Sequence, residues 1–174
     1  MLVGKRITCA VLVVLAAGLF LAGCGGGGES STSATTSGEP LSKQELVAQG
    51  DAICQNASDQ FAQLQQNPPT TAEGVATLTQ RVIEITETQV SQLRELKPPA
   101  SLQSALDDYL EALEKNIAVL RQGLKAAEQN DVTGYQVAQA KSAQGQVQRL
   151  ELARAVGFKE CSRPAGSAPS GTGG

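Results

Sequence analysis

Apolar residues recur at steps of three and four between Leu41 and Cys161, which is the period of an amphipathic helix. Three breaks interrupt the pattern, at 67–69, 97–99 and 129–131, where prolines or short polar residues gather. The sequence therefore predicts four helices joined by short corners. Because short corners leave consecutive helices antiparallel, we expect an all-α, up-down-up-down four-helix bundle.

The first predicted helix has clear signals at both ends. Ser42 and Glu45 have the spacing of a capping box, in which each side chain accepts from the backbone N–H of the other residue. The helix ends at Asn67, because the residue before a proline leaves the helical region. Its expected inward residues are Leu46, Gly50, Ile53, Ala57, Phe61 and Leu64.

The next two helices have longer apolar rows. We expect Thr70 with Glu73 to cap the second helix and Ser101 to cap the third. The inward row of the second is Val75, Leu78, Val82, Ile85, Gln89, Leu93 and Leu96. The third has an unbroken heptad seam of Leu106, Leu110, Leu113, Ile117, Leu120, Leu124 and Ala127.

The fourth helix, predicted at 132–156, has the weakest pattern. Asp131 is its expected N-cap, and Gly157 stands where a left-handed C-cap is needed. Gly134 and Gly145 each cost about 1 kcal/mol relative to alanine inside a helix. Its best apolar face is Ala140, Ala143, Val147, Leu150 and Ala153.

The N-terminus has the three parts of an export signal: Lys5 and Arg6, an uncharged apolar run over 7–21, and small residues before a cysteine. The last part, Leu21-Ala22-Gly23-Cys24, resembles the bacterial lipobox. This resemblance implies a signal peptide over 1–23 and a lipoprotein with diacylglycerol on Cys24, anchored in the cell membrane on its extracytoplasmic face. An ordinary signal peptide with a chance cysteine and an uncleaved anchor are the alternatives, although the apolar run is shorter than the ~20 residues of a membrane span.

Composition divides the rest of the chain. Residues 24–40 are rich in Gly, Ser and Thr, which is typical of a flexible linker. The four-helix domain is expected over 41–161, and the Gly-, Ser- and Pro-containing tail at 162–174 is expected to be disordered.

Two cysteines remain for the domain, Cys54 and Cys161, since Cys9 leaves with the signal and Cys24 carries lipid. An even pair in an oxidising compartment predicts a disulfide. The alternatives are a metal site or a reactive thiol. Two thiolates without histidine make a poor zinc site, which normally needs four ligands, and the two cysteines lack the C-x-x-C spacing of a redox motif. The bond requires the chain to reverse near Gly157 and run back along the first helix, since the fourth helix ends where the first begins.

Chemistry-bearing groups are scarce. The chain has no His, so the commonest general base and transition-metal ligand is missing, and we expect no enzyme activity, no cofactor and no metal. The acidic group of Asp107, Asp108, Glu111 and Glu114 is expected to be a solvated face rather than a calcium site. The formal net charge of −3 gives no reason to expect binding of nucleic acid, which usually needs a basic face.

The body also resembles a loose group of helical bacterial lipoproteins common in actinobacteria, through Leu41-Ser42-Lys43, Asp51-Ala52-Ile53-Cys54, Leu96-Lys97-Pro98-Pro99 and Gly157 with Cys161. The resemblance implies a helical domain with paired cysteines and carries no known activity.

Our leading hypothesis is a membrane-tethered interaction or envelope-structural module with an envelope protein partner. The alternative is a ligand-binding lipoprotein with an apolar groove beside the fourth helix. A glutamine-rich face on that helix, with Gln136, Gln139, Gln144, Gln146 and Gln148, is either a docking surface or simply solvated.

Overall fold

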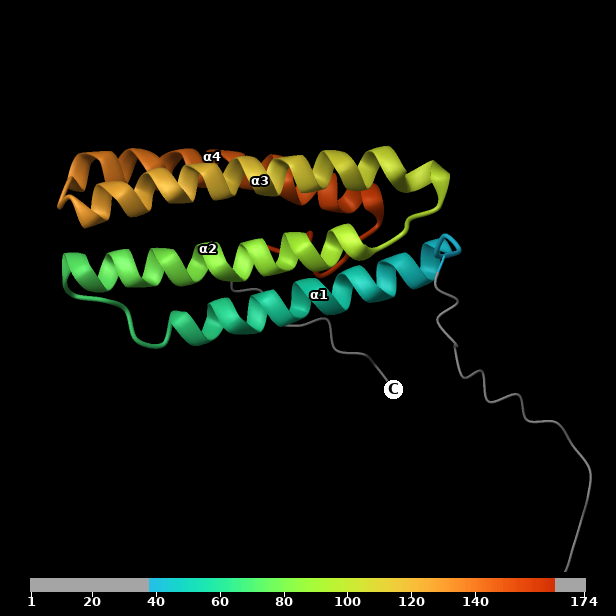
Figure 1. Ribbon diagram of the computed structural model, residues 1–174, viewed down its shortest axis with the longest axis horizontal. Helices are drawn as coiled ribbons and strands as arrows, with labels where there is room; N and C mark the ends of the chain where they lie inside the picture. The colour runs from blue at the N-terminus through green and yellow to red at the C-terminus, as the bar shows by residue number, and fades with distance from the viewer. Residues whose placement is uncertain (1–37, 165–174) are drawn as a thin grey trace, which may run out of the picture. The chain divides into compact units, whose positions relative to one another are not determined.

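The computed structural model describes residues 38–164, which form an antiparallel four-helix bundle as predicted (Figure 1). The predicted signal peptide, the lipobox with Cys24, most of the linker and the tail from 165 onward lie outside the described residues. The helices are α1 (Lys43–Leu64), α2 (Ala72–Glu95), α3 (Ala100–Glu128) and α4 (Val132–Val156). Within 38–164, no helix is both long enough and apolar enough to cross a membrane.

Local side-chain chemistry fixes several helix ends where it was predicted. The Ser42 hydroxyl accepts from the backbone N–H of Glu45 at 3.3 Å, and the Glu45 carboxylate accepts from the Ser42 N–H at 2.8 Å. Asp131 caps α4 by accepting from the Gly134 N–H at 2.9 Å. Gly157 ends α4 with φ of 104°, a left-handed conformation that glycine adopts without steric cost.

Two predicted caps are wrong by one or two residues. Thr71, not Thr70, caps α2, and its hydroxyl accepts from the Gly74 N–H at 3.1 Å. Pro99, not Ser101, is the N-cap of α3, and no side chain caps that end. Proline sets the extended entry to the helix by itself, and neighbouring cap-forming residues are not distinguished by composition.

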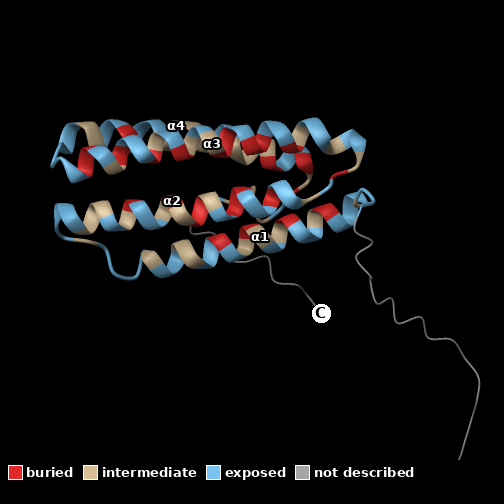
Figure 2. Ribbon diagram, viewed as in Figure 1, coloured by how far each residue is buried: buried red, intermediate tan, exposed pale blue. Residues whose placement is uncertain are grey.

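The core is densest at the end of the bundle where α1 begins and α4 ends (Figure 2). Its fully buried side chains come from all four helices and the segment after α4: Leu46, Leu93, Leu106, Val156 and Phe158. The heptad seam of α3 is buried as predicted, with Leu124 half-buried at its far end. Burial of such leucines at about 25 cal/mol per Å² of apolar area is the main favourable contribution to folding.

The buried face of α2 differs from the predicted row. Val75, Leu78 and Val82 are only half-buried, whereas a second row of Thr79, Ile83, Thr86 and Val90 is buried. The two threonines escape detection by apolar period because they are polar. Their hydroxyls donate to the carbonyls four residues back, each at 2.8 Å, so burial leaves no unpaired group. Because α2 packs against both α1 and α3, its buried stripe is wide.

The predicted inward face of α4 is wrong in its first three residues. Ala140, Ala143 and Val147 are exposed, whereas Leu150 is half-buried and Ala153 is buried as expected. The row that faces the bundle is Tyr135, Ala138, Ser142, Gly145, Arg149, Ala153 and Val156, buried or half-buried along its length. The residues in the middle of this row are small or polar, so the spacing of apolar residues indicates a different face of the helix.

Candidate functional site

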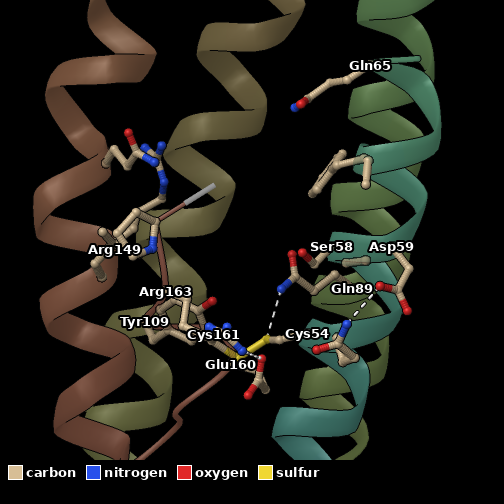
Figure 3. Close-up of a pocket in the computed structure, with 17 residues that line it drawn as sticks. Cys54, Ser58, Asp59, Gln65, Gln89, Tyr109, Arg149, Glu160, Cys161 and Arg163 are labelled. Atoms are coloured by element: carbon tan, nitrogen blue, oxygen red, sulfur yellow. Dashed lines mark hydrogen bonds and ion pairs between the residues drawn. A yellow bond between two sulfur atoms is a disulfide. The ribbon is translucent and has the colours of Figure 1, made fainter. Parts of the chain in front are cut away.

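One side of the bundle is incompletely closed. Each helix packs against its neighbour in sequence, but α1 and α4 make few direct contacts. A groove of about 390 Å³ lies between them (Figure 3). Its walls come from α1 and α4, and two residues of the other helices, Gln89 and Tyr109, also line it.

The walls are mixed in chemistry. Small and apolar side chains of α1, Ala57, Phe61 and Ala62, face Leu150 of α4. Polar residues line the groove among them: Ser58 and Asp59 from α1, Gln65 at its C-cap, and Gln146 and Arg149 from α4. A groove of this kind offers both apolar area and directed hydrogen bonds to a small molecule.

Arg149 is a half-buried cation in the lining of the groove. Its Nη2 donates to the Ser142 carbonyl at 3.0 Å, so the side chain runs back along α4 over Gly145. A Cβ on Gly145 would lie 2.8 Å from Arg149 Nη1, so the glycine leaves room for the guanidinium. Burial lowers the pKa of Arg149, and the nearby Tyr109 acts in the opposite direction. None of the carboxylates in 38–164 forms a salt bridge with this guanidinium.

Tyr109 of α3 is a buried residue whose phenol lines the same groove. The residue is 3% exposed, and its ring packs edge-on against Phe158 with centroids 6.0 Å apart. Burial raises the pKa of Tyr109 while the positive charge of Arg149 opposes that rise, so the phenol stays a neutral donor. No hydrogen bond to this hydroxyl is formed within residues 38–164, and its oxygen is not among the buried unpaired atoms, so it is open to the groove that Tyr109 lines.

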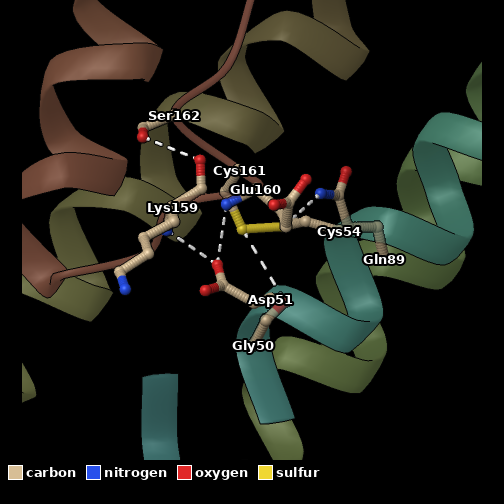
Figure 4. The surroundings of a disulfide bond; sticks show 8 residues. All are labelled: Gly50, Asp51, Cys54, Gln89, Lys159, Glu160, Cys161 and Ser162. Atoms are coloured by element: carbon tan, nitrogen blue, oxygen red, sulfur yellow. Dashed lines mark hydrogen bonds between the residues drawn. A yellow bond between two sulfur atoms is a disulfide. The ribbon is translucent and has the colours of Figure 1, made fainter. Parts of the chain in front are cut away.

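The segment after α4, residues 157–164, folds back across α1 and forms one end of the groove; we name it the C-terminal strap (Figure 4). Asp51 Oδ1 accepts from the backbone N–H groups of Lys159 and Glu160, at 2.7 and 2.9 Å. The Phe158 ring lies so close to Gly50 that a side chain there would overlap it. Gly50 therefore belongs to the binding surface for the strap.

Cys54 and Cys161 form a disulfide in the structure, with their Cα atoms 5.1 Å apart. Both features expected of this pair are present: the bond, and the reversal at Gly157 that returns the chain to α1. The buried Gln89 amide donates to Cys54 Sγ at 3.1 Å. The bond fixes the strap to α1 and borders the groove.

Ser162 and Arg163, which were assigned to the tail, take part in the strap. The Ser162 hydroxyl donates to the Lys159 carbonyl at 3.0 Å. Arg163 forms an ion pair with Glu160 at 2.5 Å, and both side chains are less than one fifth exposed. Pro164 lines the groove beside them.

The other candidate groups do not form a site. In the acidic set of α3, Asp107 accepts from Gln103 at 3.0 Å, Glu111 pairs with Lys115 at 2.9 Å, and Glu114 pairs with Arg94. Across the described part of the chain, no three His, Cys, Asp or Glu side chains converge on a metal position. Of the glutamine-rich face, Gln146 is half-buried and lines the groove, whereas Gln136, Gln139, Gln144 and Gln148 are exposed.

Sequence reasoning missed Arg149 and Tyr109 as site residues. The available signal is the spacing of Ala138, Ser142, Gly145 and Arg149, which places small and polar residues on one face of α4.

The chain matches no protein-family model, no curated protein and no solved structure.

Proposed function

We propose that this protein is a non-enzymatic, membrane-tethered lipoprotein of the extracytoplasmic face whose helical domain binds a small molecule in the groove between α1 and α4. The observation that carries the proposal is the convergence of Arg149, Tyr109 and Gln146 on a groove of about 390 Å³. Sites for small ligands have volumes of about 300–1,000 Å³ and a few directed polar groups. The lining has more polar groups than the apolar groove expected beside the fourth helix, which favours a ligand with a polar end.

The tether is supported by the lipobox at Leu21-Ala22-Gly23-Cys24. Cys24→Ala should abolish lipid labelling and release or misprocess the protein without unfolding the helices, because a linker separates Cys24 from α1. The measurements are incorporation of a labelled fatty acid and fractionation of membranes. Persistent lipid labelling of the Cys24→Ala protein would overturn the lipoprotein assignment.

The groove is tested on the full protein purified from its native membrane. Ser58→Trp places an indole in the groove, whereas Ala52→Trp places one on an exposed part of α1 that does not line it. Native mass spectrometry should detect a bound small molecule in the natural protein and in Ala52→Trp, but not in Ser58→Trp. A ligand-free natural protein, or equal occupancy in both variants, contradicts binding in the groove.

A second candidate, the interaction or envelope-structural module, is favoured by the outer face of α4. Val132, Val137 and Val147 are 68%, 48% and 64% exposed, and these three exposed large apolar residues of the part of the chain that the structure describes all lie on α4. A photo-crosslinker at Val137 or Val147 should capture the same envelope protein in cells, and one at Ser58 should not. Capture from Ser58 alone, or from none of the three, argues against this candidate.

A further inference from the structure

We propose that the ligand of the α1–α4 groove is a small carboxylate with an apolar body, bound with its anionic end against Arg149 and Tyr109. The inference rests on the proposed binding function and names the chemistry that the groove selects. It depends on three observations: a guanidinium that has no ionic partner in residues 38–164, a phenol hydroxyl that lines the same groove, and an apolar stretch of wall.

The two donors suit an anion because each has unused hydrogen-bonding capacity. One Arg149 nitrogen is occupied by the Ser142 carbonyl, and the guanidinium has further N–H groups. Tyr109 supplies an O–H donor in a buried place, where a hydrogen bond to an ionised group is strong. The planar guanidinium of Arg149 matches the geometry of a carboxylate, which can accept hydrogen bonds from two donors at once.

The other charged groups of the groove do not change this conclusion. Glu160 and Arg163 neutralise each other as an ion pair at 2.5 Å. Asp59 is exposed on α1, and its carboxylate accepts from the Gln55 amide at 2.7 Å. Arg149 is therefore the half-buried charge of the groove lining that remains without an ionic partner in residues 38–164.

The size and walls of the groove limit the rest of the ligand. A volume of about 390 Å³ corresponds to roughly thirteen water molecules at about 30 Å³ each. A molecule of about ten to thirteen non-hydrogen atoms fits that space. Ala57, Phe61, Ala62 and Leu150 offer apolar contact for a short hydrocarbon chain or an aromatic ring.

The experiment uses the full lipidated protein in nanodiscs and four probes. Octanoate and 3-phenylpropionate are the carboxylates, and octanamide and 3-phenylpropionamide are neutral molecules of matching shape. NMR titration follows the backbone amides of Ala57, Ala62 and Leu150. Both acids should saturate these shifts, and both amides should bind about tenfold more weakly or worse.

Variants assign the effect to the named groups. Arg149→Gln should weaken acid binding at least about tenfold and leave amide binding nearly unchanged, because only the charge-assisted bond is lost. Tyr109→Phe should weaken the acids by a smaller factor, and Arg149→Lys should restore part of the loss. Lys141→Gln is the matched control, since it removes one exposed charge from α4 away from the groove. The thermal midpoint of each variant shows that the bundle is folded.

The outcomes separate this inference from the function on which it rests. Equal binding of acids and amides, or an Arg149→Gln protein that binds acids normally, overturns the carboxylate proposal and leaves the groove a binding site. The same holds if no probe binds while native mass spectrometry detects a ligand that Ser58→Trp excludes. If that ligand is also absent, both the carboxylate proposal and the proposed function are wrong.

Discussion

The helices α3 and α4 lie side by side and have similar lengths, but their sequences describe very different surroundings. The α3 helix has an unbroken apolar seam, and ten of its residues are buried. The α4 helix has only Ala138, Ala153 and Val156 buried, although it packs along α3. The middle of its inward face is small or polar: the Ser142 hydroxyl donates to Asn116 of α3 at 2.8 Å, and Arg149 lines the groove.

The difference shows how a bundle keeps a polar site beside a packed core. α3 is the helix that contacts both α2 and α4, so its seam supplies the core of the domain. α4 packs against α3 along one side, and on the other side Gln146, Arg149 and Leu150 line the groove. Its attachment to α1 is made by the strap and the disulfide rather than by its own side chains.

The largest effect is expected from removing the bond that holds the weak side of the bundle. The double variant Cys54→Ser with Cys161→Ser should lower the free energy of unfolding by about 4–5 kcal/mol, the chain-entropy value for a loop of about this length. Urea denaturation measures the loss. Hydrogen exchange should show that α4 and the strap lose more protection than α3, and equal losses would contradict the comparison.

The core side is tested by a cavity in α3. Leu113→Ala should lower the free energy of unfolding by about 2–5 kcal/mol, because the side chain is 6% exposed and leaves a void. Val147→Ala in α4 is the control and should change it by less than about 0.5 kcal/mol, since that valine is 64% exposed. Chemical denaturation of both variants measures the free energy of unfolding. Similar losses would show that α3 and α4 do not differ in the burial of these side chains.

The contact between strap and α1 has a smaller expected effect. Asp51→Ala removes the acceptor of two backbone N–H groups and should cost about 1–3 kcal/mol. Asp59→Ala, on the same helix, loses only an exposed bond from Gln55 and should cost less than about 0.5 kcal/mol. Denaturation midpoints give both values. A mild Asp51→Ala effect would mean that the disulfide alone positions the strap.

The smallest effect distinguishes two glycines, one in each helix. Gly145→Ala should raise the free energy of unfolding by about 0.5–1 kcal/mol, because the new methyl meets only the flexible end of Arg149. Gly123→Ala should gain less or lose stability, since its Cβ would lie 3.2 Å from the Cβ of Ala138 and push the helices apart. Thermal and urea midpoints compare them, and a larger gain for Gly123→Ala would refute the close approach of α3 and α4.

Much of the fold was predictable because apolar spacing and end signals are local properties. The bounds of α4 follow from Asp131 and Gly157, which cap its two ends. The pairing of Cys54 with Cys161 follows from their number together with the reversal that Gly157 allows. The groove was not predictable, because Arg149 and Tyr109 are forty residues apart in the chain and meet only through packing. The buried Thr79 and Thr86 were missed for a related reason: their partners are backbone carbonyls, which no sequence pattern displays.

The disulfide also decides how the domain carries mechanical load. Cys54 and Cys161 are 107 positions apart, so the chain between them is a closed covalent ring that contains α2, α3 and α4. Tension applied between Ser42 and Pro164 passes along the first part of α1, through the sulfur–sulfur bond and into the strap. The ring carries no tension, so the roughly 350–380 Å to which it could extend does not add to the length of the stretched chain. A reductant would release that length, and the domain would change from a short inextensible link into a long compliant one.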